Sequence, residues 1–224
     1  MNSGIKISDL FDFRETIAKD IFAGCEYPWE IIPKIKSFIL ELGETLSRID
    51  FDHPADDIWI ARTANVAPTA YIHGPCIVGQ YAEIRHCAFI RGSAVIGEHA
   101  VVGNSTELKN VILFNSVQVP HYNYVGDSIL GFKAHMGAGS ITSNVKSDKS
   151  PVTVRINNET AKTGMKKVGA MLGDHVEVGC NSVLNPGTII GRNSMIYPLS
   201  LVRGYVPEDS IFKQGGEIVR KDRK

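Results

Sequence analysis

Two short segments of the sequence carry side chains that could move a proton and bind a polar ligand. Residues 121–128 hold His121 and, three positions later, Tyr124, while residues 137–144 begin with Gly-Ala-Gly and end on Asn144. Histidine is the side chain best suited to accepting a proton near neutral pH, and glycine lets a ligand approach the backbone closely. We therefore take His121 as a candidate general base. The alternative is that His121 lies in an ordinary surface turn and that Tyr124 only packs against another subunit.

A six-residue period organises most of the chain and must position these groups. Every sixth residue from Ile60 to Phe114 is aliphatic or aromatic, and the residue four positions after each is nearly always small. A helix needs a period of 3.6 and a half-buried strand a period of 2, so neither explains the pattern. A period of six fits a coil with three flat faces, in which each hexad supplies a short strand and a corner. The sequence therefore predicts an all-β repeat, a parallel β-helix of roughly six coils.

The period also relates the candidate residues to one another. Arg91 and Lys109 are eighteen residues apart, which is one coil, so we expect them to stack on the same face, where two cations suit a sugar phosphate. The alternative is that both are solvated surface charges. The pattern slips near Pro120 and resumes in a new phase at Leu130, and such a break marks a candidate site because it costs packing.

Segments outside the repeat set the expected domain organisation. Apolar residues spaced three and four apart predict two amphipathic helices within residues 1–55, around 13–21 and 31–42. We expect these helices to cap the first coil of a β-helix spanning residues 56–212; the alternative is a partner-docking module. An excursion at residues 143–171 is locally basic, and an alternating run at 151–156 before Asn157-Asn158 predicts a hairpin. Residues 213–224 read as a charged C-terminal tail.

Composition narrows the class of protein. Lys plus Arg equals Asp plus Glu, 24 each, which argues against a general nucleic-acid binder. No apolar stretch approaches the roughly 18 residues that span a bilayer, and the N-terminus lacks a secretory pattern. We expect a cytoplasmic protein with no membrane or nucleic-acid partner. The four cysteines lack C-x-x-C spacing and read as reduced thiols.

The repeat resembles the hexapeptide-repeat (left-handed parallel β-helix) acyltransferase superfamily, which implies a left-handed coil and homotrimers with active sites between neighbouring subunits. Residues 121–144 match His-x-x-Tyr-x-Gly-Asp followed by Gly-Ala-Gly-Ser/Thr-Ile-x-x-Asn without gaps. This pattern resembles the acetyltransferase domain of bifunctional N-acetylglucosamine-1-phosphate uridyltransferase/glucosamine-1-phosphate N-acetyltransferase. The excursion looks more like the archaeal-type bifunctional sugar-1-phosphate nucleotidylyltransferase/acetyltransferases.

The resemblance implies acetyl-CoA-dependent N-acetylation of a phosphorylated or nucleotide-linked amino sugar. His121 would be the general base, and a backbone N–H near Ala138 would donate to the oxyanion of the tetrahedral intermediate. The implied substrate-binding residues are Arg91, Lys109, Tyr124, His135 and Asn144.

Several positions depart from the family's pattern. His135 replaces an asparagine of the sugar site, Cys180 replaces a serine on the acyl-CoA side, and Val145 stands in place of a tyrosine. Lys213 is the nearest candidate for the family's C-terminal arginine. We therefore expect Ala138, Cys180 and Lys213 to lie on the acyl-CoA side.

Two further expectations limit the hypothesis. No segment before residue 60 resembles the nucleotide-binding half of the uridyltransferase, so we expect no nucleotidyltransferase activity from this chain. A zinc hydrolyase on the same fold would need two histidines five residues apart, and no pair has that spacing, so we expect no metal. The alternative function is a non-catalytic oligomerisation or regulatory module that binds a nucleotide-sugar enzyme.

Overall fold

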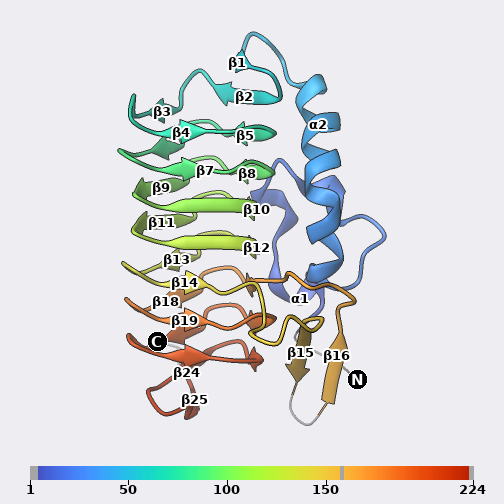
Figure 1. Cartoon of the computed structure of the whole chain (residues 1–224), viewed down its shortest axis with the longest axis vertical. Coiled ribbons are helices and arrows are strands. Elements are labelled where there is room, and N and C mark those ends of the chain that lie inside the picture. Colours follow the sequence, from blue (N-terminus) through green and yellow to red (C-terminus); the bar gives the residue numbers. More distant parts are fainter. Residues whose placement is uncertain (1–4, 157–158, 222–224) are drawn as a thin grey trace.

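The repeat winds into a parallel β-solenoid of about eight turns. A computed structural model describes residues 5–156 and 159–221. The nearer strands in Figure 1 run from left to right while the chain descends, so the coil is left-handed. The predicted fold class is confirmed. The expected six coils are too few, because two shortened coils and the inserted segment hide part of the period.

Three strand ladders form the faces of the solenoid, here named flank, back and front. The flank face contains β2 Ile58–Ala61, β5 Cys76–Val78, β8 Ala94–Ile96, β17 Ala170–Leu172, β20 Thr188–Ile190 and β23 Tyr205–Val206. The back face contains β3 Asn65–Val66, β6 Glu83–Ile84, β9 Val101–Asn104, β11 Gln118–His121, β13 His135–Met136, β18 Glu177–Val178, β21 Met195–Ile196 and β24 Ser210–Phe212. The front face contains β4 Tyr71–Ile72, β7 Phe89–Ile90, β14 Ile141–Thr142, β19 Val183–Leu184 and β22 Leu201–Val202, while β10 Glu107–Leu113 and β12 Tyr124–Leu130 run from front to flank.

The phase slip lies elsewhere than predicted. Leu108 and Leu113 both face the interior but are five residues apart, and the step from Val125 to Leu130 is also five. Both shortened steps lie at the corner between front and flank, whereas Pro120 lies in phase. Because Leu113 takes the interior position, Phe114 turns outward, and its ring centroid lies 5.1 Å from that of Phe11 in the N-terminal segment.

The N-terminal segment lies along the flank face, not over the first coil (Figure 1). It comprises α1 Ile7–Leu10, the 3₁₀ turns η1 Phe13–Glu15, η2 Lys19–Phe22 and η3 Pro28–Lys34, and α2 Ile35–Thr45. The predicted helix over 31–42 is largely confirmed as η3 and α2. The one over 13–21 is wrong: backbone groups there bond to the coil, as when the Asn115 N–H donates to the Glu15 carbonyl.

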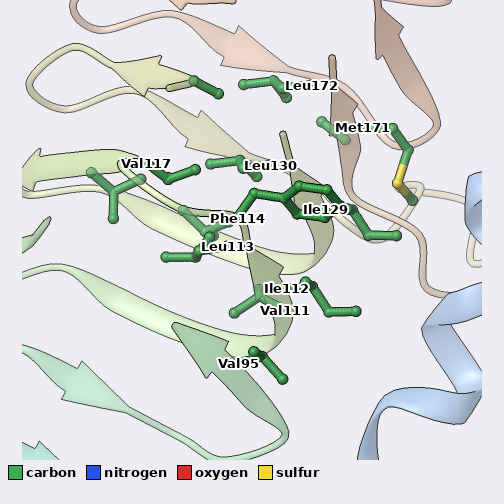
Figure 2. Close-up of a cluster of buried hydrophobic side chains, with 14 of the residues drawn as sticks. Val95, Val111, Ile112, Leu113, Phe114, Val117, Ile129, Leu130, Met171 and Leu172 are labelled. Carbon is green, nitrogen blue, oxygen red and sulfur yellow. The ribbon is translucent and has the colours of Figure 1, made fainter. Parts of the chain in front are cut away.

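The flank face explains this position. Its outward residues are apolar coil after coil, and Figure 2 shows Ile112, Ile129 and Met171 on the side of the ladder nearer α2, with Leu113 and Leu130 on the inner side. All five are buried. An apolar column this long must be covered. The open ends of the ladder are instead protected by antiparallel strands, β1 Phe51–Ala55 on β2 and β25 Ile218–Arg220 on β24.

The excursion forms the predicted hairpin and folds back onto the flank. β15 Thr153–Ile156 and β16 Glu159–Lys162 pair antiparallel, and β15 packs against β20 and β23. The turn expected at Asn157-Asn158 lies outside the described residues. Gly204 has φ +84°, and a Cβ there would lie 2.9 Å from the Arg155 carbonyl oxygen, so only glycine admits the hairpin this closely. None of the helices in the described ranges is long and apolar enough to cross a lipid bilayer.

Replacing Gly204 with alanine should loosen this hairpin. Gly216 has a similar φ of +90° but nothing within 4 Å of an added Cβ, so Gly216→Ala is a control that reports backbone strain alone, about 1–2 kcal/mol. We expect Gly204→Ala to lower the free energy of unfolding in urea by a further ~1–3 kcal/mol and to speed proteolysis of the hairpin. Equal losses in the two variants would contradict the proposed contact.

Candidate active site

The corner between the back and front faces stacks three of the predicted residues in one column. His121, Ala138 and Cys180 occupy equivalent positions in successive coils: the Gly139 N–H donates to the His121 carbonyl at 3.0 Å, and the Asn181 N–H donates to the Ala138 carbonyl at 2.8 Å. The stacking of coils therefore brings the candidate base together with two residues assigned to the acyl-CoA side, across one shortened step and across the excursion.

The local fold of the corner holds His121 without using its imidazole. The His121 N–H donates to Asn123 Oδ1 at 3.1 Å, and the buried Asn123 amide donates to the Gly137 and Ser140 carbonyls at 2.8 and 3.1 Å. The ring itself is exposed and makes no hydrogen bond to any described residue. This arrangement fixes the His121 backbone, presents the imidazole to solvent and leaves both ring nitrogens available to a ligand.

The next coil supplies a backbone donor beside it. The Gly139 N–H is committed to the His121 carbonyl, whereas the Ala138 N–H has no acceptor among the described residues. The Ala138 N–H belongs to the coil after His121, and the backbones of neighbouring coils lie ~4.8 Å apart. The sequence did not predict the role of Asn123, which orients both segments; its position two residues after His121 is the only signal.

A second cluster forms at the corner between the front and flank faces, around the buried carboxylate of Asp127. Lys109 Nζ lies 2.8 Å from Asp127 Oδ1, and Asn110 Nδ2 lies 2.9 Å from the same oxygen. Asn144 Nδ2 donates to Asp127 Oδ2 at 2.6 Å and to the Tyr124 hydroxyl at 3.3 Å. The structure thus brings Lys109, Tyr124 and Asn144 together, through an aspartate to which the sequence assigned no role.

The two predicted phosphate-binding cations are stacked as expected, but both have carboxylate partners. Leu108 pairs with Ile90 in the ladder, so Lys109 follows Arg91 along the corner. Arg91 Nη1 lies 2.7 Å from Glu107 Oε1, and Lys109 is paired with Asp127. Burial, followed by the negative charge of Asp127, raises the pKa of Tyr124. Tyr124 is therefore a neutral phenol at neutral pH.

The remaining two predicted residues lie apart from these clusters. His135 sits on the back face, where its Nδ1 lies 2.8 Å from Glu177 Oε2, and shares a polar surface hollow with Lys133 and Gln118. Lys213 follows β24 in the last coil, 3.4 Å from Glu217. Among the described residues, no group of three or more His, Cys, Asp and Glu side chains is placed to hold a metal ion.

Comparison with known proteins identifies relatives of this chain. Over 123 residues, 54% of this chain, the sequence is 37% identical to the bifunctional protein GlmU of Methanococcus maripaludis, of which the match covers 30%. It is 34% identical over 112 residues to a bifunctional sugar-1-phosphate nucleotidylyltransferase/acetyltransferase of Sulfurisphaera tokodaii, covering 50% of this chain and 28% of that protein. The chain therefore matches less than a third of the length of these relatives.

A relative of similar length is the uncharacterized acetyltransferase YaiX of Escherichia coli, 29% identical over 160 residues, which are 71% of this chain and 70% of YaiX. The relatives therefore include acetyltransferases, which agrees with the enzyme class expected from the motifs. The model of the GMPPB C-terminal domain family matches residues 72–190. Because that match spans more than half of the whole chain, this protein belongs to the GMPPB C-terminal domain family.

Proposed function

We propose that this protein is an acetyl-CoA-dependent N-acetyltransferase whose acceptor is a phosphorylated or nucleotide-linked amino sugar. The observation that carries the proposal is the back–front corner, where the His121 imidazole and the Ala138 backbone N–H lie in adjacent coils and neither is hydrogen-bonded to a residue that the structure describes. Amide formation from a thioester needs these two groups, a base for the amine and a donor for the oxyanion. The names of the relatives support the same class of reaction.

In the proposed reaction the sugar amine attacks the thioester carbonyl carbon of acetyl-CoA. His121 accepts the proton that the amine loses as the N–C bond forms. The Ala138 N–H donates to the carbonyl oxygen as it gains negative charge. Collapse of the tetrahedral intermediate breaks the C–S bond, and the CoA thiolate leaves and is protonated.

The second cluster would hold the sugar. Tyr124 is the first residue of β12, three positions after His121. Its hydroxyl meets the Asn144 amide at the front–flank corner, whereas the imidazole lies at the back–front corner. Asp127 fixes the Asn144 amide from behind, which leaves a rigid polar surface for the hydroxyls of a sugar. Cys180 lies one coil after Ala138 in the same column and would contact the acyl-CoA. Lys213 lies further along the solenoid.

We also propose that the working form is a homotrimer. The front face carries exposed apolar side chains towards both of its ends: Tyr71 is 62% exposed, Phe89 40% and Leu201 67%. Exposed apolar groups of this kind favour association with another subunit. The front face lies beside the His121 corner, so an adjoining subunit would close the site.

A thermal-shift and turnover experiment tests the proposal. A ligand at a hundred times its Kd stabilises the folded state by about 2.7 kcal/mol, which raises the melting temperature of a chain this long by roughly 5–11 °C. We expect such a rise with acetyl-CoA and with glucosamine-1-phosphate, and release of the CoA thiol when both are present. Glucose-1-phosphate, which lacks the amine, should give no thiol release.

A second candidate, a non-catalytic assembly module, is favoured by one observation. The matched relatives are more than three times as long as the matched segment, so the same fold serves there as one part of a larger protein. This candidate predicts a melting-temperature rise with a nucleotide sugar but no thiol release from acetyl-CoA with any amino sugar phosphate. That pair of results would overturn the acetyltransferase proposal.

A further inference from the structure

A polar cavity lies between the start of the excursion and the solenoid, separate from the His121 corner. Its volume is about 330 Å³, near the lower end of the range for small-molecule sites. The lining combines the excursion with the front–flank corner: Ser143, Val145, Lys146, Ser147, Asp148, Thr153, Arg155, Asn185, Pro186, Arg203 and Gly204. Most of these side chains can donate or accept a hydrogen bond.

Two arginines in this cavity have no partner within the described ranges. Arg155 comes from β15 and Arg203 follows β22, and both side chains are exposed. The lining also holds Lys146 and one acid, Asp148, so three cations face one carboxylate. Asp148 Oδ1 accepts from the Ser150 N–H at 2.9 Å and from its hydroxyl at 2.7 Å. Asp148 keeps its negative charge, so three cations and one carboxylate leave the lining a net charge of +2.

The cations of the predicted phosphate site differ from those of the cavity in their ion pairs. Arg91 and Lys109 each have a carboxylate at 2.7–2.8 Å, so an incoming phosphate would have to compete with Glu107 and Asp127. Within the described residues neither Arg155 nor Arg203 is ion-paired, and the one acid of the lining, Asp148, is hydrogen-bonded to Ser150. The uncompensated positive charge of the front–flank corner therefore lies in the cavity, not at the stacked pair.

The cavity continues the same corner that carries the sugar cluster. The Ser143 N–H donates to the Leu184 carbonyl and the Asn185 N–H to the Val202 carbonyl, each at 2.8–2.9 Å, so residues 143, 185 and 203 stack in successive coils. Residue 143 adjoins Asn144 directly. At ~4.8 Å per coil, Arg203 lies roughly 10 Å along the corner from Ser143, a length that one ligand with a sugar and a diphosphate can span.

We propose that this cavity binds the diphosphate of a nucleotide-linked ligand. Guanidinium groups present forked donors that match phosphate oxygens and stay charged at every relevant pH, and two of them from different segments can clamp two linked phosphates. A diphosphate of this kind occurs in a nucleotide sugar and in coenzyme A. Which of these two compounds supplies the diphosphate depends on the proposed function. The proposal that the cavity binds a diphosphate does not depend on it.

Calorimetric titration with inorganic pyrophosphate tests the site on the whole chain without any acetyl acceptor. We expect wild-type binding that weakens as salt rises, and a Kd increased about tenfold or more in Arg155→Ala and in Arg203→Ala. Lys162→Ala, in β16 and outside the cavity lining, is the matched control and should change Kd less than about twofold. Because the two arginines lie on different segments, misfolding of the hairpin in one variant leaves the other informative.

Competition identifies the source of the diphosphate. Displacement of pyrophosphate by UDP but not by coenzyme A would assign the cavity to a nucleotide sugar, and the reverse would assign it to the acyl donor. No pyrophosphate binding, equal weakening in Lys162→Ala, or displacement by neither compound would overturn the proposal. These readouts do not involve His121, so a failure of acetyl transfer and a failure of this site are distinguishable.

Discussion

Replacing His121 with alanine should reduce acetyl transfer by about 10²- to 10⁴-fold, the range over which a positioned general base accelerates a reaction. The imidazole makes no hydrogen bond to any described residue and is exposed, so its removal breaks no internal contact. The corner is held instead by the buried Asn123 amide. Release of the CoA thiol from acetyl-CoA and glucosamine-1-phosphate measures the loss, and an unchanged melting temperature shows that the fold is intact.

The control for this variant is a histidine elsewhere on the surface. His99 stacks on Tyr81 with ring centroids 5.0 Å apart, at a different corner of the solenoid. His99→Ala should keep turnover within about twofold of wild type, as expected for a surface substitution away from the site. Wild-type turnover in His121→Ala would end its assignment as the base, even if sugar binding survived.

Replacing Asp127 with alanine should lower the free energy of unfolding by about 3–5 kcal/mol, the usual cost of breaking a buried ion pair from one side. The carboxylate is 2% exposed and accepts from Lys109, Asn110 and Asn144. Its removal takes the carboxylate partner from the Lys109 ammonium and leaves each of the two amides one acceptor, the Ile32 carbonyl for Asn110 and the Tyr124 hydroxyl for Asn144. Asp127 also has φ +49°, a conformation that alanine adopts at a cost of about 1–2 kcal/mol.

Urea unfolding measures the effect, and two further variants separate its causes. Asp127→Asn keeps the shape and tolerates the left-handed conformation, so it should lose less than Asp127→Ala. The exposed Asp20 serves as control, since Asp20→Ala should stay within about 0.5 kcal/mol of wild type. A loss below about 1 kcal/mol in Asp127→Ala would mean that Lys109 and Asn144 are held by other contacts.

The sequence alone determined the solenoid, because its period of six is a local property that repeats in every coil. The same periodicity correctly stacked Arg91 and Lys109, which are one coil apart. The hairpin strand at 151–156 was also readable from alternation, apart from the two residues that are not described. The motif around His121 and the glycines after it predicts a site at the back–front corner, and the catalytic role of that corner stays a prediction.

Contacts between segments far apart in the sequence were decided only by the tertiary structure. The position of the N-terminal segment depends on an outward apolar column, visible in the sequence as three consecutive apolar residues at several flank strands, such as Val111–Leu113. A period of six does not say what covers that column. Nor does it say that Asp127 neutralises Lys109, or that β15 folds back to set Arg155 beside Arg203. Charge pairing depends on where side chains meet in space, so sequence spacing identified Arg91 and Lys109, while only the fold showed that both are paired and that Arg155 and Arg203 share a cavity.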